Sequence, residues 1–343
     1  MGGSGEYYAR DVTDRRMRSN LTGVSSLAQT ELSQSSVERE FLPKDRRLVC
    51  SARNPLVYIF DVTGSMGNLP KIIYDKWPGI VGQVAARNYL PDPEMSLSAV
   101  GDITSDRAPL QMADFAVLRN LDKNFKRIYF EGAGGLPDVE SYEVAAYYYA
   151  YLCDMPKAEN PICLFTGDEG FRERIYPDDL RNHFGGEHTS TTATTVFAEL
   201  KKKFKGNVLL IHRHYPNENS NTRIVAEWRN VLGKDRVILL PRGTDGDLAI
   251  GDITLGVYAI VSGARTLTQY LEDMRTRPLD LGQGVEYEPQ SPERIKQVKE
   301  ALAPLAGFTP VAMKTAEPST KSKSTDKAKP AKGKGEKSAP WKL

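Results

Sequence analysis

The sequence predicts an α/β fold, with a doubly wound, mostly parallel sheet and helices on both of its faces. Apolar runs of strand length alternate with longer amphipathic segments through the middle of the chain, a pattern typical of a parallel sheet covered by helices. Two of the apolar runs stop abruptly at an aspartate, Asp61 with glycines shortly after it and Asp168 in a Gly-Asp turn. No repeat with a period of roughly 20 to 50 residues is visible in the sequence, so the alternation predicts one domain, over residues 51–280.

The first elements of this domain can be justified one by one. The run LVYIF at 56–60 predicts a fully buried strand. Residues 71–89 have near-helical apolar spacing, although Pro78 is expected to kink or break that helix. Residues 95–102 alternate like a strand, with 109–115 as the predicted hairpin partner. The later expected strands are 161–170, 207–212 and 236–241, and the later expected helices are 140–152, 193–204, 222–232, 255–274 and 292–302.

The helix expected over 140–152 is rich in tyrosine. Its five tyrosines cannot share one helix face, so some are expected to pack in the core, and the others offer a partner surface. These tyrosines are Tyr142, Tyr147, Tyr148, Tyr149 and Tyr151.

Composition narrows the class of protein. The 46 basic and 44 acidic residues leave a formal charge of +2, which argues against a nucleic-acid binder by bulk charge. An apolar content of 40% is enough to form a core. The apolar runs fall far short of the ~18 residues of a membrane helix, and the first residues have no secretory pattern. The protein is therefore expected to be soluble and without membrane contact. Its three cysteines contain no CxxC pair and cannot all pair in disulfides, which favours a reducing, cytoplasmic location.

The two ends of the chain differ from the middle. Residues 1–50 form a polar arm, with one helical pattern around 24–37, and residues 281–313 form a C-terminal extension. Residues 314–343 carry nine lysines against three acidic residues, a charge of 9 − 3 = +6, and are expected to be disordered. This basic tail either only solubilises the protein or contacts an acidic partner or nucleic acid.

The chemistry is expected at the carboxyl ends of two strands. Asp61 and Asp168 both follow strand-like runs, and in an open parallel sheet ligands bind beyond the carboxyl ends of strands, where the strand order reverses. Thr63 and Ser65 follow Asp61 at i+2 and i+4 in a loop that leads to a helix. Two carboxylates and two hydroxyls suit a hard cation that keeps some waters. The pattern therefore predicts a site for Mg²⁺ or Mn²⁺.

These motifs resemble the von Willebrand factor A (vWA) domain, a Rossmann-like fold with a metal-ion-dependent adhesion site, or MIDAS. The family's Asp-x-Ser-x-Ser motif appears as Asp61-Val62-Thr63-Gly64-Ser65, with Thr in place of the first Ser. The family's last metal-binding Asp matches Asp168, although the usual Asp-Gly order becomes Gly-Asp here. The resemblance covers about residues 55–270.

The middle motif departs from the common pattern and is closer to the glycine-rich, Glu-bearing version of bacterial intracellular members. Gly134 and Gly135 would let the loop pass close to the ion. Either Asp138 or Glu140 would then reach the ion, directly or through water. Asp102, at the end of the second predicted strand, is expected on the same rim, outside the direct ligands.

The resemblance implies a binding protein and not an enzyme. In this family the open coordination position of the ion is filled by a carboxylate from a partner protein. An adaptor or scaffold role follows, and intracellular vWA domains often work beside AAA+ ATPases or within multi-protein complexes.

Two alternatives remain for the same residues. An isolated Asp-x-Thr-Gly-Ser segment can be only a turn and helix cap, because these side chains satisfy exposed backbone N–H groups. A haloacid-dehalogenase-like, Mg²⁺-dependent phosphohydrolase would instead use Asp61 as its nucleophile. Residue 63 is not acidic, and only Glu169 closely follows Asp168 as a further carboxylate, which argues against the phosphohydrolase.

Overall fold

A mostly parallel sheet organises the computed structural model, which describes residues 24–32, 36–130, 138–276 and 290–310. Its strand order is β13-β12-β8-β2-β3-β4, and β5 also pairs with β3. The first five strands are mutually parallel, whereas β4 and β5 run antiparallel to β3. Their bounds are β2 (Pro55–Asp61), β3 (Glu94–Val100), β4 (Leu110–Met112), β5 (Ala116–Val117), β8 (Ile162–Gly167), β12 (Val208–His212) and β13 (Val237–Leu239). The predicted α/β class and the hairpin after β3 are confirmed.

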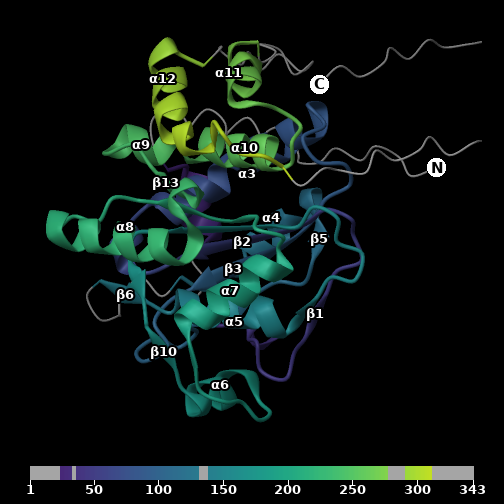
Figure 1. Ribbon diagram of the computed structural model, residues 1–343, viewed down its shortest axis with the longest axis vertical. Helices are drawn as coiled ribbons and strands as arrows, with labels where there is room; N and C mark the ends of the chain where they lie inside the picture. The colour runs from purple at the N-terminus through teal and green to yellow at the C-terminus, as the bar shows by residue number, and fades with distance from the viewer. Residues whose placement is uncertain (1–23, 33–35, 131–137, 277–289, 311–343) are drawn as a thin grey trace, which may run out of the picture.

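Helices cover both faces of this sheet, as Figure 1 shows. On one face lie α3 (Leu69–Ala86) and α10 (Ile250–Val261), and on the other lie α5 (Tyr142–Tyr151), α7 (Ala193–Lys203) and α8 (Glu218–Leu232). Alternate side chains of a strand point to opposite faces. Accordingly Tyr58 and Phe60 join the core beneath α3 and α10, whereas Ile59 joins the core beneath α5, α7 and α8.

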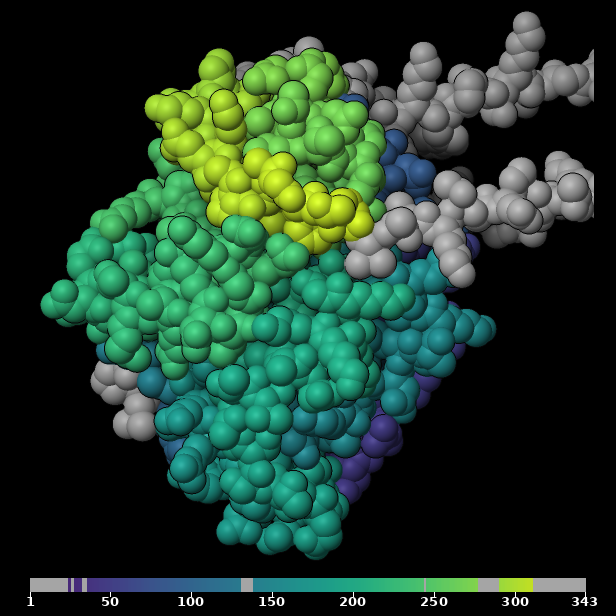
Figure 2. Space-filling model, in the orientation of Figure 1, coloured from purple at the N-terminus to yellow at the C-terminus, as the bar shows by residue number. Residues whose placement is uncertain are grey.

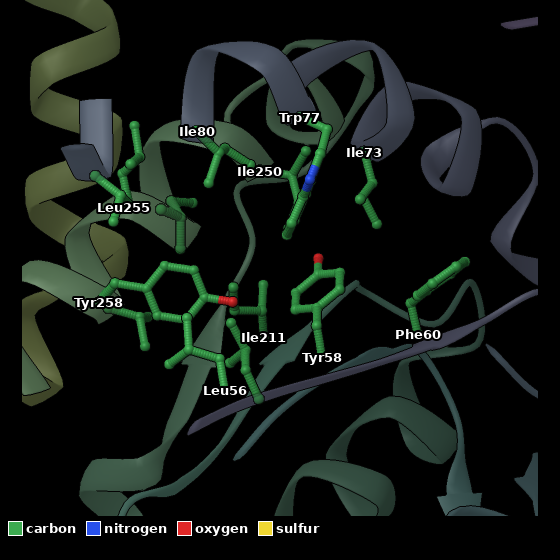
Figure 3. Packing of buried hydrophobic residues seen from close by; sticks show 14 of the residues in the cluster. Leu56, Tyr58, Phe60, Ile73, Trp77, Ile80, Ile211, Ile250, Leu255 and Tyr258 are labelled. Carbon is green, nitrogen blue, oxygen red and sulfur yellow. The ribbon is translucent and has the colours of Figure 1, made fainter. Parts of the chain in front are cut away.

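The core beneath α3 and α10 is visible in Figure 3. Side chains of β2, among them Tyr58, lie toward Ile73 and Trp77 of α3 and toward Leu255 and Tyr258 of α10. Burial of such apolar surface contributes about 25 cal/mol per Å². The sheet has an apolar core on each of its two faces, so every residue of β2 is buried.

Of the kink or break predicted at Pro78, a break is wrong, because α3 runs continuously through this residue. Proline removes one backbone donor from the helix interior. Pro78 is buried, and its neighbour Trp77 packs in the core toward the sheet, so tertiary packing holds the helix across the missing hydrogen bond.

The predicted helix over 255–274 is instead two helices, α10 and α11 (Leu267–Arg275). Gly263 takes a φ of +80°, and Thr266 begins α11 with a capping box to Gln269. The helix expected at 292–302 is α12 (Pro292–Ala301), which packs against α10 and α11. In Figure 2 its yellow surface lies directly on the green surface of these helices.

The expected arm helix is shorter than its pattern and spans α2 (Ser26–Glu31), where Ser25 caps the helix and bonds Asp75 of α3. Within the described residues no helix is both long and apolar enough to cross a membrane. The basic tail 314–343 lies outside the described residues.

The remaining elements are η1 (Arg39–Phe41), β1 (Leu48–Val49), η2 (Gly64–Met66), η3 (Leu118–Asn120), α4 (Leu121–Phe125), β6 (Val139–Glu140), β7 (Cys153–Asp154), β9 (Gly170–Phe171), β10 (Arg174–Ile175), α6 (Pro177–Phe184), β11 (Thr191–Thr192), η4 (Lys234–Arg236), α9 (Thr244–Leu248) and η5 (Ala303–Leu305).

Candidate metal centre

The topological switch point of the sheet lies between β2 and β8. From β2 the chain passes through α3 to β3 on one side, whereas β8 pairs with β2 on the other side. Asp61 is the last residue of β2, and Asp168 follows β8 directly. Because the two strands are parallel, both aspartates lie at the same edge, where such sheets bind ligands.

Asp61 organises the loop that follows it. The backbone N–H of Thr63 donates to Asp61 Oδ1 at 2.7 Å, and the Thr63 hydroxyl donates to the same oxygen at 2.5 Å. This Asx turn leads into η2 and so to Ser65, whose Oγ lies 3.3 Å from the Thr63 Oγ1. The i, i+2, i+4 pattern therefore places one carboxylate and two hydroxyls together.

Asp168 completes the group from the neighbouring strand. The Ser65 hydroxyl donates to Asp168 Oδ1 at 2.9 Å. The other carboxylate oxygen, Asp168 Oδ2, is buried and has no hydrogen-bond partner. The structure thus joins Asp61, Thr63, Ser65 and Asp168 in one continuous series of contacts, and it leaves one buried acceptor free in that series.

A tyrosine that the sequence pattern assigned to no site also belongs here. Tyr142, the first residue of α5, is fully buried and donates from Oη to Asp61 Oδ2 at 2.6 Å. A Cβ at Gly167 would lie 1.8 Å from that hydroxyl oxygen. The Gly-Asp order at 167–168 therefore has a structural reason, since only glycine leaves room for Tyr142 to reach Asp61.

The two carboxylates of this group have raised pKa values. Burial, followed by the charge of Asp61, raises the pKa of Asp168 to about 7. Burial also raises the pKa of Asp61, against the opposing effect of its hydrogen bonds from Thr63 and Tyr142. A bound cation would relieve both the desolvation and the mutual repulsion.

Glu140 lies beside the same group. It is 1% exposed, and its Oε2 has no hydrogen-bond partner. Burial and then the charge of Asp61 raise the pKa of Glu140 to about 11. The parallel pairing of β6 with β9 sets Val139 opposite Gly170 and Glu140 opposite Phe171, so Glu140 lies near Glu169, which directly precedes β9. Burial and the charge of Asp168 raise the pKa of Glu169 to about 8.

The structure separates Glu140 from the other residue predicted for this loop. Asp138 accepts a hydrogen bond from Ser220 at 2.7 Å and pairs with Arg223 at 3.3 Å, so its carboxylate is bound to α8. Its pKa is lowered, mainly by the Ser220 bond. Glu140 is therefore the better placed of the two to face the aspartates. Gly134 and Gly135 lie outside the described residues.

Asp102 sits on the neighbouring rim, after β3, and repeats the local geometry of Asp61. The N–H and hydroxyl of Thr104 both donate to Asp102 Oδ1 at 2.8 Å. Here, however, the Arg172 guanidinium pairs with the same oxygen. Asp102 thus has a resident counter-ion in Arg172.

A second residue that the sequence did not indicate is Arg213, directly after β12. Its Nη1 donates to the backbone oxygen of Ser65 at 2.9 Å and lies 3.8 Å from Asp168 Oδ2. Its Nε and Nη2 donate to the two carboxylate oxygens of Asp247 in α9, at 3.0 and 3.3 Å. Only its position after a strand at the switch-point edge could have suggested it.

The donor set fits a hard divalent cation. Two carboxylates, one of them with a buried oxygen that has no hydrogen-bond partner, and two hydroxyls are all oxygen donors, which Mg²⁺ and Mn²⁺ prefer. Over the described ranges, no group of three or more His, Cys, Asp or Glu residues is arranged to hold a metal. The candidate centre has two carboxylates, and it depends on hydroxyls for the rest.

No protein-family model matches the chain, and no curated protein matches it. Among solved structures, the chain is similar to the open conformation of the pilus adhesin SpaC from Lactobacillus rhamnosus GG, with a TM-score of 0.41, 10% identity and 63% of this chain covered. It is also similar to proximal thread matrix protein 1 from the mussel byssus, described with a zinc-occupied MIDAS motif, with a TM-score of 0.40, 8% identity and 61% of this chain covered. The matches span 31% of the adhesin chain and 49% of the mussel chain. At this level of similarity, function has to be argued from the site itself.

Proposed function

We propose that this chain is a vWA-type binding domain, with Asp61, Thr63, Ser65 and Asp168 as the residues that would hold Mg²⁺ or Mn²⁺. When bound, the cation would supply an electrophilic position for a carboxylate of a partner protein. One observation carries the proposal: the series of contacts from Asp61 to Asp168 at the switch point, with a buried Asp168 Oδ2 that has no hydrogen-bond partner. Hydroxyl donors add no negative charge, so a cation there stays attractive to an incoming anion.

The contacts of the hydroxyls favour a cation site over a capped turn. A helix cap would direct a side-chain oxygen to the backbone N–H groups of the following helix. Neither Thr63 at the start of η2 nor Asn68 at the start of α3 makes a side-chain cap. Instead, the Thr63 and Ser65 hydroxyls are directed at Asp61 and Asp168.

Binding is also favoured over phosphoryl transfer. A nucleophilic carboxylate needs an oxygen that substrate can approach. Asp61 is 0% exposed, and each of its oxygens accepts a hydrogen bond, from Thr63 or from Tyr142. The carboxylate keeps lone pairs for a small cation but presents no exposed oxygen to a phosphoryl group. We therefore propose a non-enzymatic adaptor or scaffold, with an AAA+ ATPase or a multi-protein complex as the kind of partner that the family resemblance suggests.

The test is calorimetric titration of Mg²⁺ and of Mn²⁺ into the wild type, the Asp61→Ala/Asp168→Ala double variant and a control, Asp178→Asn, at an exposed position on α6. Turnover of p-nitrophenyl phosphate is assayed in the same samples, and circular dichroism checks folding. The proposal expects binding in the wild type and the control, loss in the double variant, and no turnover. Absence of binding in the folded wild type would favour the capped turn, and turnover that the double variant loses would favour the phosphohydrolase.

A further inference from the structure

Arg213 is the cation whose charge acts directly on the candidate metal centre. Its guanidinium lies 3.8 Å from Asp168 Oδ2, at the oxygen that has no hydrogen-bond partner. The side chain is 26% exposed and is fixed from two sides, by the Ser65 carbonyl and by Asp247. Arginine stays protonated at any accessible pH, so its charge is a constant feature of the site.

At Asp102, by comparison, the counter-ion bonds the carboxylate directly. There the Arg172 guanidinium contacts the carboxylate oxygen that also accepts from Thr104, within a hydrogen-bonded group. Arg213, by contrast, forms two hydrogen bonds to Asp247 and none to Asp168. Arg213 therefore acts on Asp168 through its charge alone, and Asp168 Oδ2 stays available to another ligand.

We propose that Arg213 is a resident counter-cation that lowers the affinity of the Asp61–Asp168 centre for a divalent cation, and that Asp247 sets the strength of this effect. The inference rests on the proposed function, because it presupposes that the centre binds a cation. The positive charge of Arg213 opposes an incoming cation, whereas the negative charge of Asp247 on its far side reduces that opposition. Arg213 is thus a positioning residue whose charge sets the cation concentration at which the site fills.

A purely structural role for the same residue makes a different prediction. If Arg213 only holds the Ser65 loop against α9, loss of either Arg213 or Asp247 disturbs the loop and weakens cation binding. If charge dominates, the two substitutions act in opposite directions. Removing Arg213 then tightens binding, and removing the charge of Asp247 weakens it.

The experiment measures the affinity for Mn²⁺ alone, by electron paramagnetic resonance of free Mn²⁺, in full-length wild type, Arg213→Gln, Arg213→Lys and Asp247→Asn. The control is Arg181→Gln, which removes an exposed arginine that pairs with Asp178 on α6. From Coulombic interaction at this separation we expect binding about 3- to 10-fold tighter in Arg213→Gln and weaker by a similar factor in Asp247→Asn. Arg213→Lys and Arg181→Gln are expected to stay near the wild type.

Weaker or unchanged binding in Arg213→Gln, or tighter binding in Asp247→Asn, would overturn the inference while leaving the metal centre in place. Weaker binding in Arg213→Lys as well would assign the residue a structural role instead. Failure of the proposed function gives a separate result, in which the wild type itself binds no Mn²⁺ or the Asp61→Ala/Asp168→Ala variant binds it equally well.

Discussion

At the scale of single residues, the Gly167-Asp168 pair links packing to the candidate chemistry. Gly167 leaves the space in which Tyr142 reaches Asp61, and Asp168 contributes the carboxylate that accepts from Ser65. The sequence indicated Asp168 because it ends an apolar run. It could not indicate the role of Gly167, because the side chain that needs the space lies 25 residues earlier in the chain, on another element.

Substitution of Gly167 by alanine tests this link. The new Cβ would meet Tyr142 Oη at 1.8 Å, so Tyr142 has to move away from Asp61. We expect a loss of about 1–3 kcal/mol in the free energy of unfolding, as for other overpacked cores, together with weaker Mn²⁺ binding. Urea unfolding and Mn²⁺ titration measure the two effects. In the control, Gly82→Ala, nothing lies within 4 Å of the added Cβ in α3, so stability should hold or rise. Equal behaviour of the two variants would contradict the packing argument.

The titration of Asp168 gives a second prediction at this scale. Its pKa is raised from 3.8 to about 7 by burial and by the charge of Asp61, so the folded chain holds a proton that the unfolded chain releases between these values. The free energy of unfolding of the metal-free protein should therefore fall as pH rises from about 4 to about 7. Asp168→Asn cannot release this proton, so its stability should depend less on pH.

Urea unfolding at several pH values, in the presence of a chelator, measures this difference. Glu143, whose pKa burial raises to about 8, contributes a similar slope in both proteins. The difference between the two profiles therefore reports Asp168 together with its effect on Glu169, whose pKa the charge of Asp168 raises. Parallel pH profiles for the wild type and Asp168→Asn would show that Asp168 is not held protonated in the folded chain. Added Mg²⁺ should stabilise the wild type more at high pH, where the carboxylates are charged.

At the scale of elements, patterns that are local in sequence were predictable and contacts between distant elements were not. The apolar run of β2 identified a buried strand, and the spacing of Asp61, Thr63 and Ser65 identified their loop, because both depend on neighbours in the chain. The continuity of α3 through Pro78 and the split between α10 and α11 at Gly263 depended on tertiary packing and capping instead.

The candidate site shows the same division. Tyr142 begins α5, whereas Glu169 and Arg213 lie in the loops that follow β8 and β12. The order of β12, β8 and β2 in the sheet brings these two loops to the same edge as Asp61. From the sequence, Glu140 and Asp138 were equally good candidates for the residue that reaches the ion. The pairing of β6 with β9 and the hydrogen bond from Ser220 separate them, and neither contact leaves a local sequence signal.

At the scale of the whole molecule, the strand order determines where chemistry can occur. β3 and β8 flank β2 on opposite sides, so the strand order reverses between β2 and β8. The loops after these two strands therefore separate at one edge of the sheet, and the crevice between them is lined by their polar side chains. Several buried carboxylates gather there, with Arg213 and Arg172 as nearby cations. Burial and mutual repulsion raise the pKa values of these carboxylates, and a bound cation would relieve both effects, which is the whole-molecule reason to expect one at this edge.

The most direct test of this account is a crystal structure of the full chain grown with Mn²⁺, with anomalous difference density collected at a wavelength where manganese scatters anomalously. The account predicts one strong peak within coordination distance of the Thr63 and Ser65 hydroxyls, between Asp61 and Asp168. A crystal that shows no peak at this position at saturating Mn²⁺, or a peak only between Glu140 and Glu169, would contradict it.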